Sequence, residues 1–301
     1  QIPFEVYAFS NSNSRRKEVT ANYELNDITI DNRFHLINFV SSRMNTKEFD
    51  NAMKILFHTS CLYDKGRWMR FSSRKPVEHN LMHDLPDTPR GYGLSSTPLN
   101  DAIMATYKLV PAFVKRYSID KMNTIFLTDG CSDGNNHKII EKDDTDNGYE
   151  YAEIINNKFK RGYMMSYDKN AVLVDRKTKR QYHVDHGWRY PNGLTENLLQ
   201  ILKDRTGSKV LGFYVSARKR IDNYAMDKYF DYQVRSKIHA QFRKDKVVTV
   251  TNSTGYDEIY LLAGDNMQVQ DGQMATPSEN AKKGEIKRLF TSTLKGNKQS
   301  R

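Results

Sequence analysis

The sequence has few cysteines and no long apolar run, and each shortage excludes a class of protein. Only two of its 301 residues are cysteine, Cys61 and Cys131, so a disulfide framework is excluded. No stretch approaches the roughly 18 apolar residues of a membrane-spanning helix. Residues 1–10 have neither the basic start nor the apolar core of a secretory signal. We therefore expect a cytoplasmic protein with no membrane partner.

Motifs of common catalytic and metal sites are also scarce. The phosphate-binding pattern Gly-x-x-x-x-Gly-Lys-Ser/Thr does not occur, which argues against a P-loop ATPase. His79 and His83 are four residues apart, a spacing that zinc sites use, and His183 and Asp185 would share one face of a strand as a ligand or catalytic pair, with His186 on the other face. A polar loop explains the first pair and a surface hairpin the second, so both interpretations stay open.

The charge is strongly positive. Lys and Arg number 47 against 36 Asp and Glu, which gives a net charge of +11. Nucleic acid, an acidic protein or an anionic assembly would each suit such a chain, as would a solvated surface that keeps it in solution. Basic and aromatic residues alternate at 158–163 and 177–182. This mixture suits phosphate contacts and base stacking, but it is equally common on a basic hairpin.

Apolar periodicity alternates between strand and helix along the chain. Strands are expected at 2–9, 34–40, 123–128, 171–174, 181–184, 209–215, 247–250 and 259–262. Helices are expected at 46–58 behind an Asn45–Glu48 capping box, from Pro98, at 194–205 before Gly207, within 224–242, and near 286–294. The alternation predicts a layered α/β domain with a mostly parallel sheet.

The domain organisation follows from where the periodicity stops. We expect one domain over 1–264, interrupted by insertions at about 59–96 and 135–193. The second insertion holds a β-hairpin. Residues 265–301 form a polar and basic tail.

Two loops stand out as a candidate metal site. Thr97 lies in a loop that leads into a helix, and Asp129 follows a short apolar strand. A hydroxyl and a carboxylate are hard oxygen donors of the kind that Mg²⁺ takes. Loops at the carboxyl ends of strands are where open α/β sheets place ligands. The alternative is a helix N-cap at Ser96 or Thr97 and a plain turn at Asp129.

The pairing of these loops resembles the von Willebrand factor A (VWA) family, a three-layer Rossmann-like fold. In that family an adhesion site for Mg²⁺ or Mn²⁺ uses three loops: Asp-x-Ser-x-Ser, a Thr, and an Asp in a strand-Asp-Gly turn. Thr97 matches the second and Asp129 the third, and both are implied metal ligands. Ser96, Asn100 and Asp133 are expected around the ion. The resemblance covers roughly residues 1–137 and 193–242.

The chain departs from the family in one respect. No Asp-x-Ser-x-Ser occurs in the sequence, and the strand that precedes this motif in the family is not evident. We expect that the chain is part of a longer product whose earlier residues supply both. We expect the metal to be bound only if the Asp-x-Ser-x-Ser motif is present. The alternative is a degenerate domain that binds no metal.

Within the family, Val6–Ser10 and Phe126–Gly130 resemble CobT-type cobaltochelatase subunits and their relatives in large tailed phages. The resemblance implies a non-catalytic adaptor that works with a MoxR/CobS-like AAA+ ATPase. By analogy it would act in a cobaltochelatase complex of cobalamin biosynthesis, or in the host cytoplasm if a phage encodes it. The alternative is a basic nucleic-acid- or virion-associated binding protein with a degenerate metal site.

Overall fold

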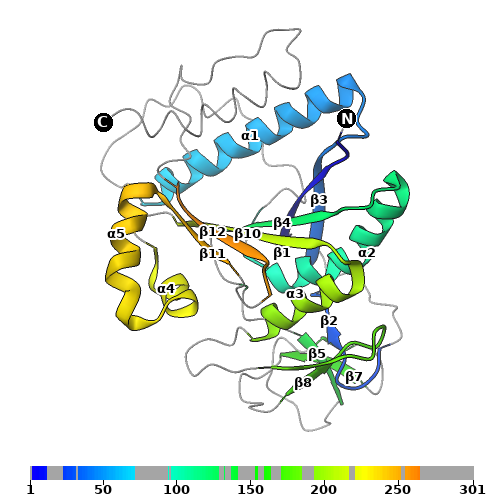
Figure 1. Ribbon diagram of the computed structural model, residues 1–301. Coiled ribbons are helices and arrows are strands. Elements are labelled where there is room, and N and C mark those ends of the chain that lie inside the picture. The colour runs from blue at the N-terminus through cyan, green and yellow to red at the C-terminus, as the bar shows by residue number, and fades with distance from the viewer. Residues whose placement is uncertain are drawn as a thin grey trace. The chain divides into compact units, whose positions relative to one another are not determined.

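The computed structural model describes residues 2–11, 23–31, 33–71, 94, 96–128, 132, 137–141, 153–154, 159–163, 171–184, 193–216, 221–251 and 255–264 (Figure 1). The chain divides into two compact units. The first comprises Gln1–Leu211 with Asn252–Asp257, and the second comprises Gly212–Thr251 with Glu258–Arg301. The predicted tail helix at 286–294 lies outside the described residues.

Helices and strands alternate as the sequence predicts, with additional short strands. The helices are α1 (Thr46–Phe71), α2 (Leu99–Tyr117), α3 (Gly193–Thr206), α4 (Asn223–Tyr229), the 3₁₀ turn η2 (Tyr232–Val234) and α5 (Arg235–Asp245). The strands are β1 (Glu5–Asn11), β2 (Ile28–Thr29), β3 (Phe34–Ser41), β4 (Asn123–Thr128), β5 (His137–Glu141), β6 (Glu153–Ile154), β7 (Phe159–Tyr163), β8 (Val172–Val174), β9 (Gln181–His183), β10 (Lys209–Ser216), β11 (Val247–Thr251) and β12 (Glu258–Ala263).

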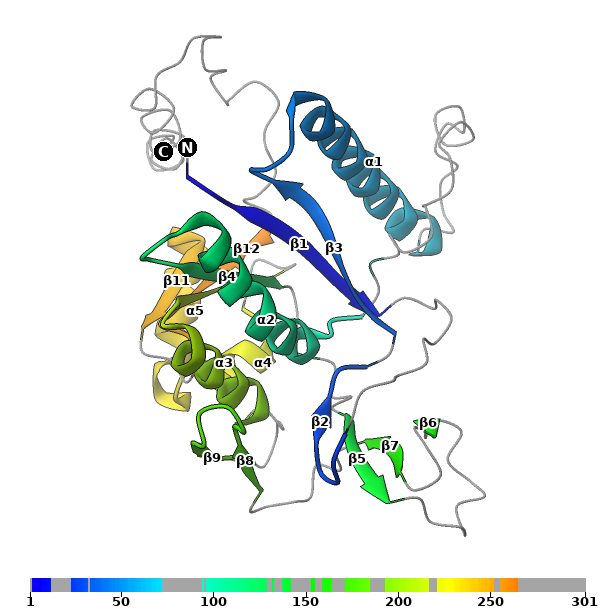
Figure 2. The same ribbon diagram turned by 90° about the vertical axis from the view of Figure 1, so that its right-hand side faces the viewer.

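The sheets mix parallel and antiparallel strands, which agrees with the expected α/β class. One four-stranded sheet has the order β11-β12-β10-β4, and β11 pairs with β12 antiparallel. β1 and β3 form a separate antiparallel pair with Ser10 opposite His35 (Figure 2). A further sheet, β2-β5-β7-β6, is antiparallel throughout.

Helix α1 begins at the predicted capping box. The Asn45 N–H donates to Glu48 Oε2 at 2.9 Å, and the Glu48 N–H donates to Asn45 Oδ1 at 3.0 Å. These two bonds satisfy backbone donors that a helix start leaves unpaired. The helix continues to Phe71, beyond the predicted end at 58, although residues 59–71 lack a clear apolar period.

Helices α2 and α3 pack against each other and carry much of the core of the first unit. Ile103 of α2 and Leu199 and Leu202 of α3 are completely buried. Gly255 lies beside α3 at φ +90°, where an added Cβ would come within 3.0 Å of the Leu199 side chain. Only glycine tolerates both that backbone conformation and that approach. Gly207, at φ +64°, ends α3 as the sequence predicts.

The second unit packs a helix against a hairpin. Phe242 of α5 is completely buried, and α5 contacts β11. The Asp222 side chain caps α4 by accepting from the Ala225 N–H at 2.9 Å and also accepts from the Tyr214 hydroxyl at 2.5 Å. These bonds fix the start of α4 against β10.

In the part of the chain that the structure describes, no helix combines the length and the apolar character that crossing a bilayer requires.

Leu202→Ala tests the packing of α3. Removing a completely buried leucine side chain should lower the free energy of unfolding by about 2–5 kcal/mol, because transfer and cavity terms add. Urea denaturation followed by circular dichroism measures this. The matched control is Phe57→Ala, at a side chain that is 72% exposed, which should change stability by less than about 0.5 kcal/mol. Equal losses in both variants would contradict the packing described.

Candidate functional site

Three of the five residues singled out from the sequence lie at the start of α2, Ser96 and Thr97 in the loop before it and Asn100 in its first turn. Ser96 is exposed and has a φ of +66°, in the left-handed region that side chains rarely adopt. Thr97 is half-buried, and its carbonyl accepts the Leu99 N–H at 2.8 Å. Pro98 is the N-cap of α2, so the alternative that Ser96 or Thr97 caps the helix is wrong. The other two residues, Asp129 and Asp133, lie outside the described residues.

Asn100 joins this loop to two other segments. Its backbone N–H donates to Ser132 Oγ at 3.2 Å, and its side-chain Oδ1 accepts from Thr195 Oγ1 at 2.6 Å. Ser132 lies in the loop that follows β4, and Thr195 lies in the first turn of α3. Asn100 and Thr195 are both buried. The start of α2, the loop after β4 and the start of α3 therefore meet at one place, as a ligand site at the carboxyl end of a strand requires.

Ser132 was not among the predicted site residues, although a sequence signal points to it. Residues 130–134 read Gly-Cys-Ser-Asp-Gly, which matches the Gly-x-Ser-x-Gly pattern of serine hydrolases. In those enzymes the serine lies on a turn between a strand and a helix. Here β4 is followed by another strand, β5. The surroundings therefore do not match a nucleophile elbow, and Ser132 Oγ accepts a backbone hydrogen bond instead.

The described donors at this place include hydroxyl oxygens, which suit a hard cation, and the buried carboxylate of Asp101 lies in the first turn of α2. Thr97 and Ser132 contribute neutral hydroxyl oxygens near the start of α2. Mg²⁺ sites usually include one or two carboxylates as well. Within the described ranges, no group of three or more His, Cys, Asp and Glu side chains could hold a metal ion. A metal centre here therefore depends on Asp129 and on any ligands outside the printed sequence.

Of the candidate histidine ligands, the structure describes His183. His183 is exposed in β9 opposite Val172, and its carbonyl accepts from Asn197 Nδ2 at 2.8 Å. This is the predicted surface hairpin. His79, His83 and His186 lie outside the described residues.

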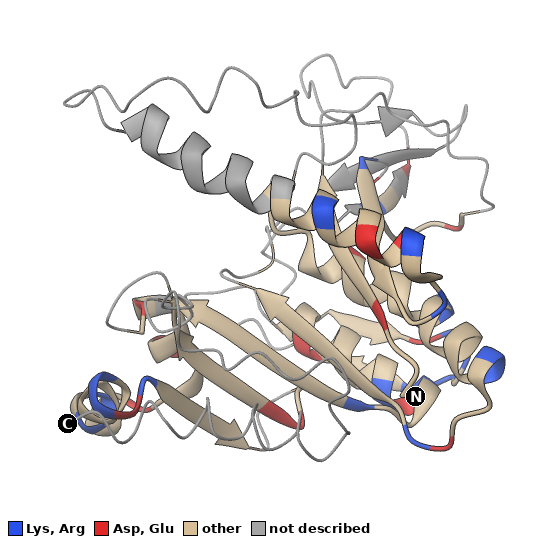
Figure 3. Cartoon of the chain, turned by 90° about the horizontal axis from the view of Figure 1, so that it is seen from above, with Lys and Arg blue, Asp and Glu red and all other residues tan. Residues whose placement is uncertain are grey.

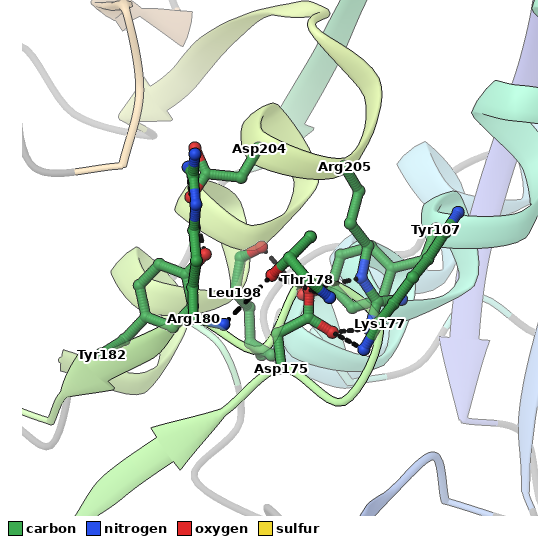
Figure 4. Close-up of polar contacts among 9 residues, drawn as sticks. All are labelled: Tyr107, Asp175, Lys177, Thr178, Arg180, Tyr182, Leu198, Asp204 and Arg205. Carbon is green, nitrogen blue, oxygen red and sulfur yellow. Dashed lines mark hydrogen bonds and ion pairs between the residues drawn. The ribbon is translucent and has the colours of Figure 1, made fainter.

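The basic and aromatic stretch at 177–182 holds the hairpin β8–β9 against α3 (Figure 4). The Tyr182 hydroxyl donates to Asp204 Oδ2 at 2.6 Å, and Arg180 pairs with the same carboxylate at 2.8 Å. Burial alone would raise the pKa of the Asp204 carboxyl, but these hydrogen bonds and one from Gln200 lower it overall. Tyr182 and Arg180 are therefore engaged within the fold. The side chains of the stretch at 158–163 lie outside the described residues.

A second ion pair under the same hairpin is more deeply buried. Asp175 has no exposed side-chain surface, and its carboxylate pairs with the Arg205 guanidinium of α3. It also accepts the Lys177 N–H at 3.0 Å and the Thr178 hydroxyl at 2.7 Å, which shapes the turn between β8 and β9 (Figure 4). Arg205 lies 4.5 Å from the centroid of the Tyr107 ring on α2. The half-buried guanidinium of Arg205 thus connects the hairpin, α3 and α2.

The electrostatics of this cluster follow from the geometry. Desolvation would raise the pKa of the Asp175 carboxyl, but the hydrogen bonds from Arg205, Thr178 and Lys177 hold it well below its ordinary value. Burial raises the pKa of the Tyr107 hydroxyl far above its ordinary value despite the nearby Arg205 charge. That hydroxyl donates to the Leu198 carbonyl at 2.8 Å. Tyr107 therefore stays neutral and Asp175 stays charged, as in a structural ion pair rather than an acid–base catalyst.

Comparison with protein-family models, with curated proteins and with solved structures finds no match for this chain.

Thr195→Val tests whether Asn100 holds the segments together. The change keeps the side-chain shape but removes the donor to the buried Asn100 Oδ1. It should lower the free energy of unfolding by about 1–3 kcal/mol, the usual cost of an unsatisfied buried acceptor. Chemical denaturation measures the loss. The same substitution at the exposed Thr46 should cost less than about 0.5 kcal/mol, and an equally small loss at Thr195 would contradict the assignment.

Asp175→Asn tests the buried ion pair through its pH dependence. The pKa of Asp175 is lower in the folded chain than its ordinary value, so its stabilisation is fully present above about pH 4 and is lost as the pH falls below that. At pH 7 the variant should be less stable by on the order of 2–3 kcal/mol, because Arg205 loses its charged partner.

The difference between wild type and Asp175→Asn should shrink as the pH falls from about 5 towards 2. Urea unfolding at a series of pH values measures it. The control is Asp120→Asn at an exposed carboxylate, for which the difference should be small at every pH. A difference for Asp175→Asn that stays constant at low pH would show that charge pairing is not its cause.

Proposed function

We propose that this chain is a VWA-type interaction domain that binds a protein partner through Mg²⁺ or Mn²⁺ and acts in the cytoplasm. The binding surface is the place where the start of α2, the loop after β4 and the start of α3 meet. The observation that carries the proposal is the pair of hydrogen bonds made by Asn100 to Ser132 and Thr195. These bonds link the start of α2 to the loop after β4, and the resemblance to the VWA family rests on these two segments.

The order of elements gives further support. β1 and β3 form an antiparallel pair, and β4 belongs to a different sheet. In the VWA family a further strand lies in the interior of the sheet. A strand at that position would join the β1–β3 pair to the sheet that contains β4. The resemblance includes a strand at 2–9, a helix at 46–58, a helix at 194–205 and a strand at 209–215, and β1, α1, α3 and β10 lie at these segments.

In this proposal the site residues have different tasks. Thr97 and Asp129 bind the ion, and Ser96 and Asp133 lie around it. Asn100 is a positioning residue, because its N–H and its Oδ1 are already used to hold Ser132 and Thr195. The ion needs the Asp-x-Ser-x-Ser element, which the printed sequence does not contain. When bound, the ion supplies an open coordination position for an Asp or Glu of the partner.

The partner in this proposal is an AAA+ ATPase of the MoxR/CobS type, and the chain is its adaptor. The role corresponds to that of CobT in a cobaltochelatase complex, or to that of its relatives in tailed phages. This part rests on fold-level analogy alone, which defines an expectation for function but does not establish it.

Affinity capture from lysate with the longest native product that contains these residues tests the proposal. We expect an AAA+ ATPase to be retained in Mg²⁺, to be released by EDTA, and to be lost with Thr97→Ala. Thr46→Ala, at an exposed hydroxyl on α1, is the matched control and should retain the partner. A partner set that neither EDTA nor Thr97→Ala changes would contradict a metal-dependent interaction.

A further inference from the structure

The helical part of the second unit carries an excess of positive charge. Residues 228–246 include six Lys or Arg and only two Asp. The segment comprises the last residues of α4, the turn η2 and the whole of α5. Figure 3 shows these charges on the ribbon. This segment differs from the two basic stretches that the sequence first suggested, at 158–163 and 177–182.

Helix α5 presents its charges on the face that does not pack. Phe242 is completely buried, where α5 contacts β11. Lys237 and Lys244 are exposed and two turns apart along the helix, and Arg243 is exposed beside Lys244. Two turns correspond to about 10 Å along the axis. Among the described residues, none of these three side chains pairs with a carboxylate, so all three are available to an anionic partner.

An aromatic ring lies at the start of this basic face. Tyr232 in η2 is 84% exposed, which is unusual for so large an apolar surface. The Arg235 guanidinium lies 5.7 Å from the centroid of the Tyr232 ring, and Arg235 also pairs with Asp227 of α4. The Arg235 guanidinium beside the ring is therefore held in place by its pair with Asp227 of α4. An exposed ring next to fixed positive charge is the combination on which unpaired bases stack.

We propose that η2 and α5 form a binding surface for single-stranded nucleic acid. Lys237, Arg243 and Lys244 contact successive phosphates, and Tyr232 stacks on a base. An acidic peptide would use the three charges but has no need of the ring. A duplex would use the charges while its bases stay stacked on each other, so the exposed ring favours a single strand. The surface lies within one compact unit and does not depend on the metal proposed above.

Fluorescence anisotropy with the full chain and a labelled oligo(dT) tests this. The oligonucleotide should exceed the roughly 4–16 nucleotides that one such site covers. Titrations between about 50 and 200 mM salt give the slope of affinity against salt, which is about −0.7 per phosphate contact for a single strand. All titrations contain EDTA, so that a failure of the metal proposal does not affect the result.

Two sets of variants separate charge from stacking. The triple variant Lys237→Gln, Arg243→Gln, Lys244→Gln should weaken binding at least tenfold and reduce the salt slope by about 2. The matched control removes three exposed lysines elsewhere, Lys47, Lys54 and Lys108, and should change binding less than threefold. Tyr232→Ala should weaken single-strand binding about tenfold, and Tyr232→Phe should retain it.

Several results would overturn the proposal. One is equal loss in the triple variant and its control, which would indicate net charge rather than a defined surface. Others are unchanged single-strand binding in Tyr232→Ala, or a duplex bound as tightly as oligo(dT). Polyglutamate of matched length that competes as well as the oligonucleotide would point to an acidic protein instead. Circular dichroism of each variant confirms that it is folded.

Discussion

The candidate site depends on the need to satisfy the polar groups of one buried residue, the backbone N–H and the side-chain oxygen of Asn100. Asn100 lies 32 residues from Ser132 and 95 residues from Thr195 in the sequence, yet it contacts both. A buried polar atom without a partner costs about 1–3 kcal/mol, so the fold is restricted to arrangements that keep both contacts. Because Asn100 is in the first turn of α2, that restriction also fixes the position of the Thr97 loop. The geometry of the proposed binding surface is thus a consequence of core hydrogen bonding.

A second buried interaction decides which basic residues are available to a partner. The Asp175–Arg205 pair holds the hairpin β8–β9 on α3, and Arg205 also lies against the Tyr107 ring. Nearby, Tyr182 and Arg180 are engaged with Asp204. The hairpin therefore uses Tyr182 and Arg180 for its own docking. In α5 the corresponding side chains are exposed, which is why the nucleic-acid proposal concerns that helix.

Local patterns predicted the elements well and their pairing less well. The Asn45–Glu48 capping box, the strand at 123–128 and the stop at Gly207 were all readable, because each depends on residues adjacent in sequence. The two-residue strands β2 and β6 have no readable period, so the sheet β2-β5-β7-β6 was missed. Residues 59–71 do not read as a helix in the sequence, because their apolar residues lack helical spacing. Ser132 and Thr195 were missed because their roles arise only from contacts with Asn100.

The central claim is that Thr97 binds a divalent cation together with Asp129. The most direct measurement is anomalous diffraction from crystals of the longest native product that contains these residues, grown with Mn²⁺. The account predicts an anomalous peak at a ligand distance of about 2.1–2.3 Å from Thr97 Oγ1 and coordinated by Asp129 or by a water that it binds. A well-ordered Thr97 loop without such a peak, or a peak only elsewhere on the chain, would contradict it.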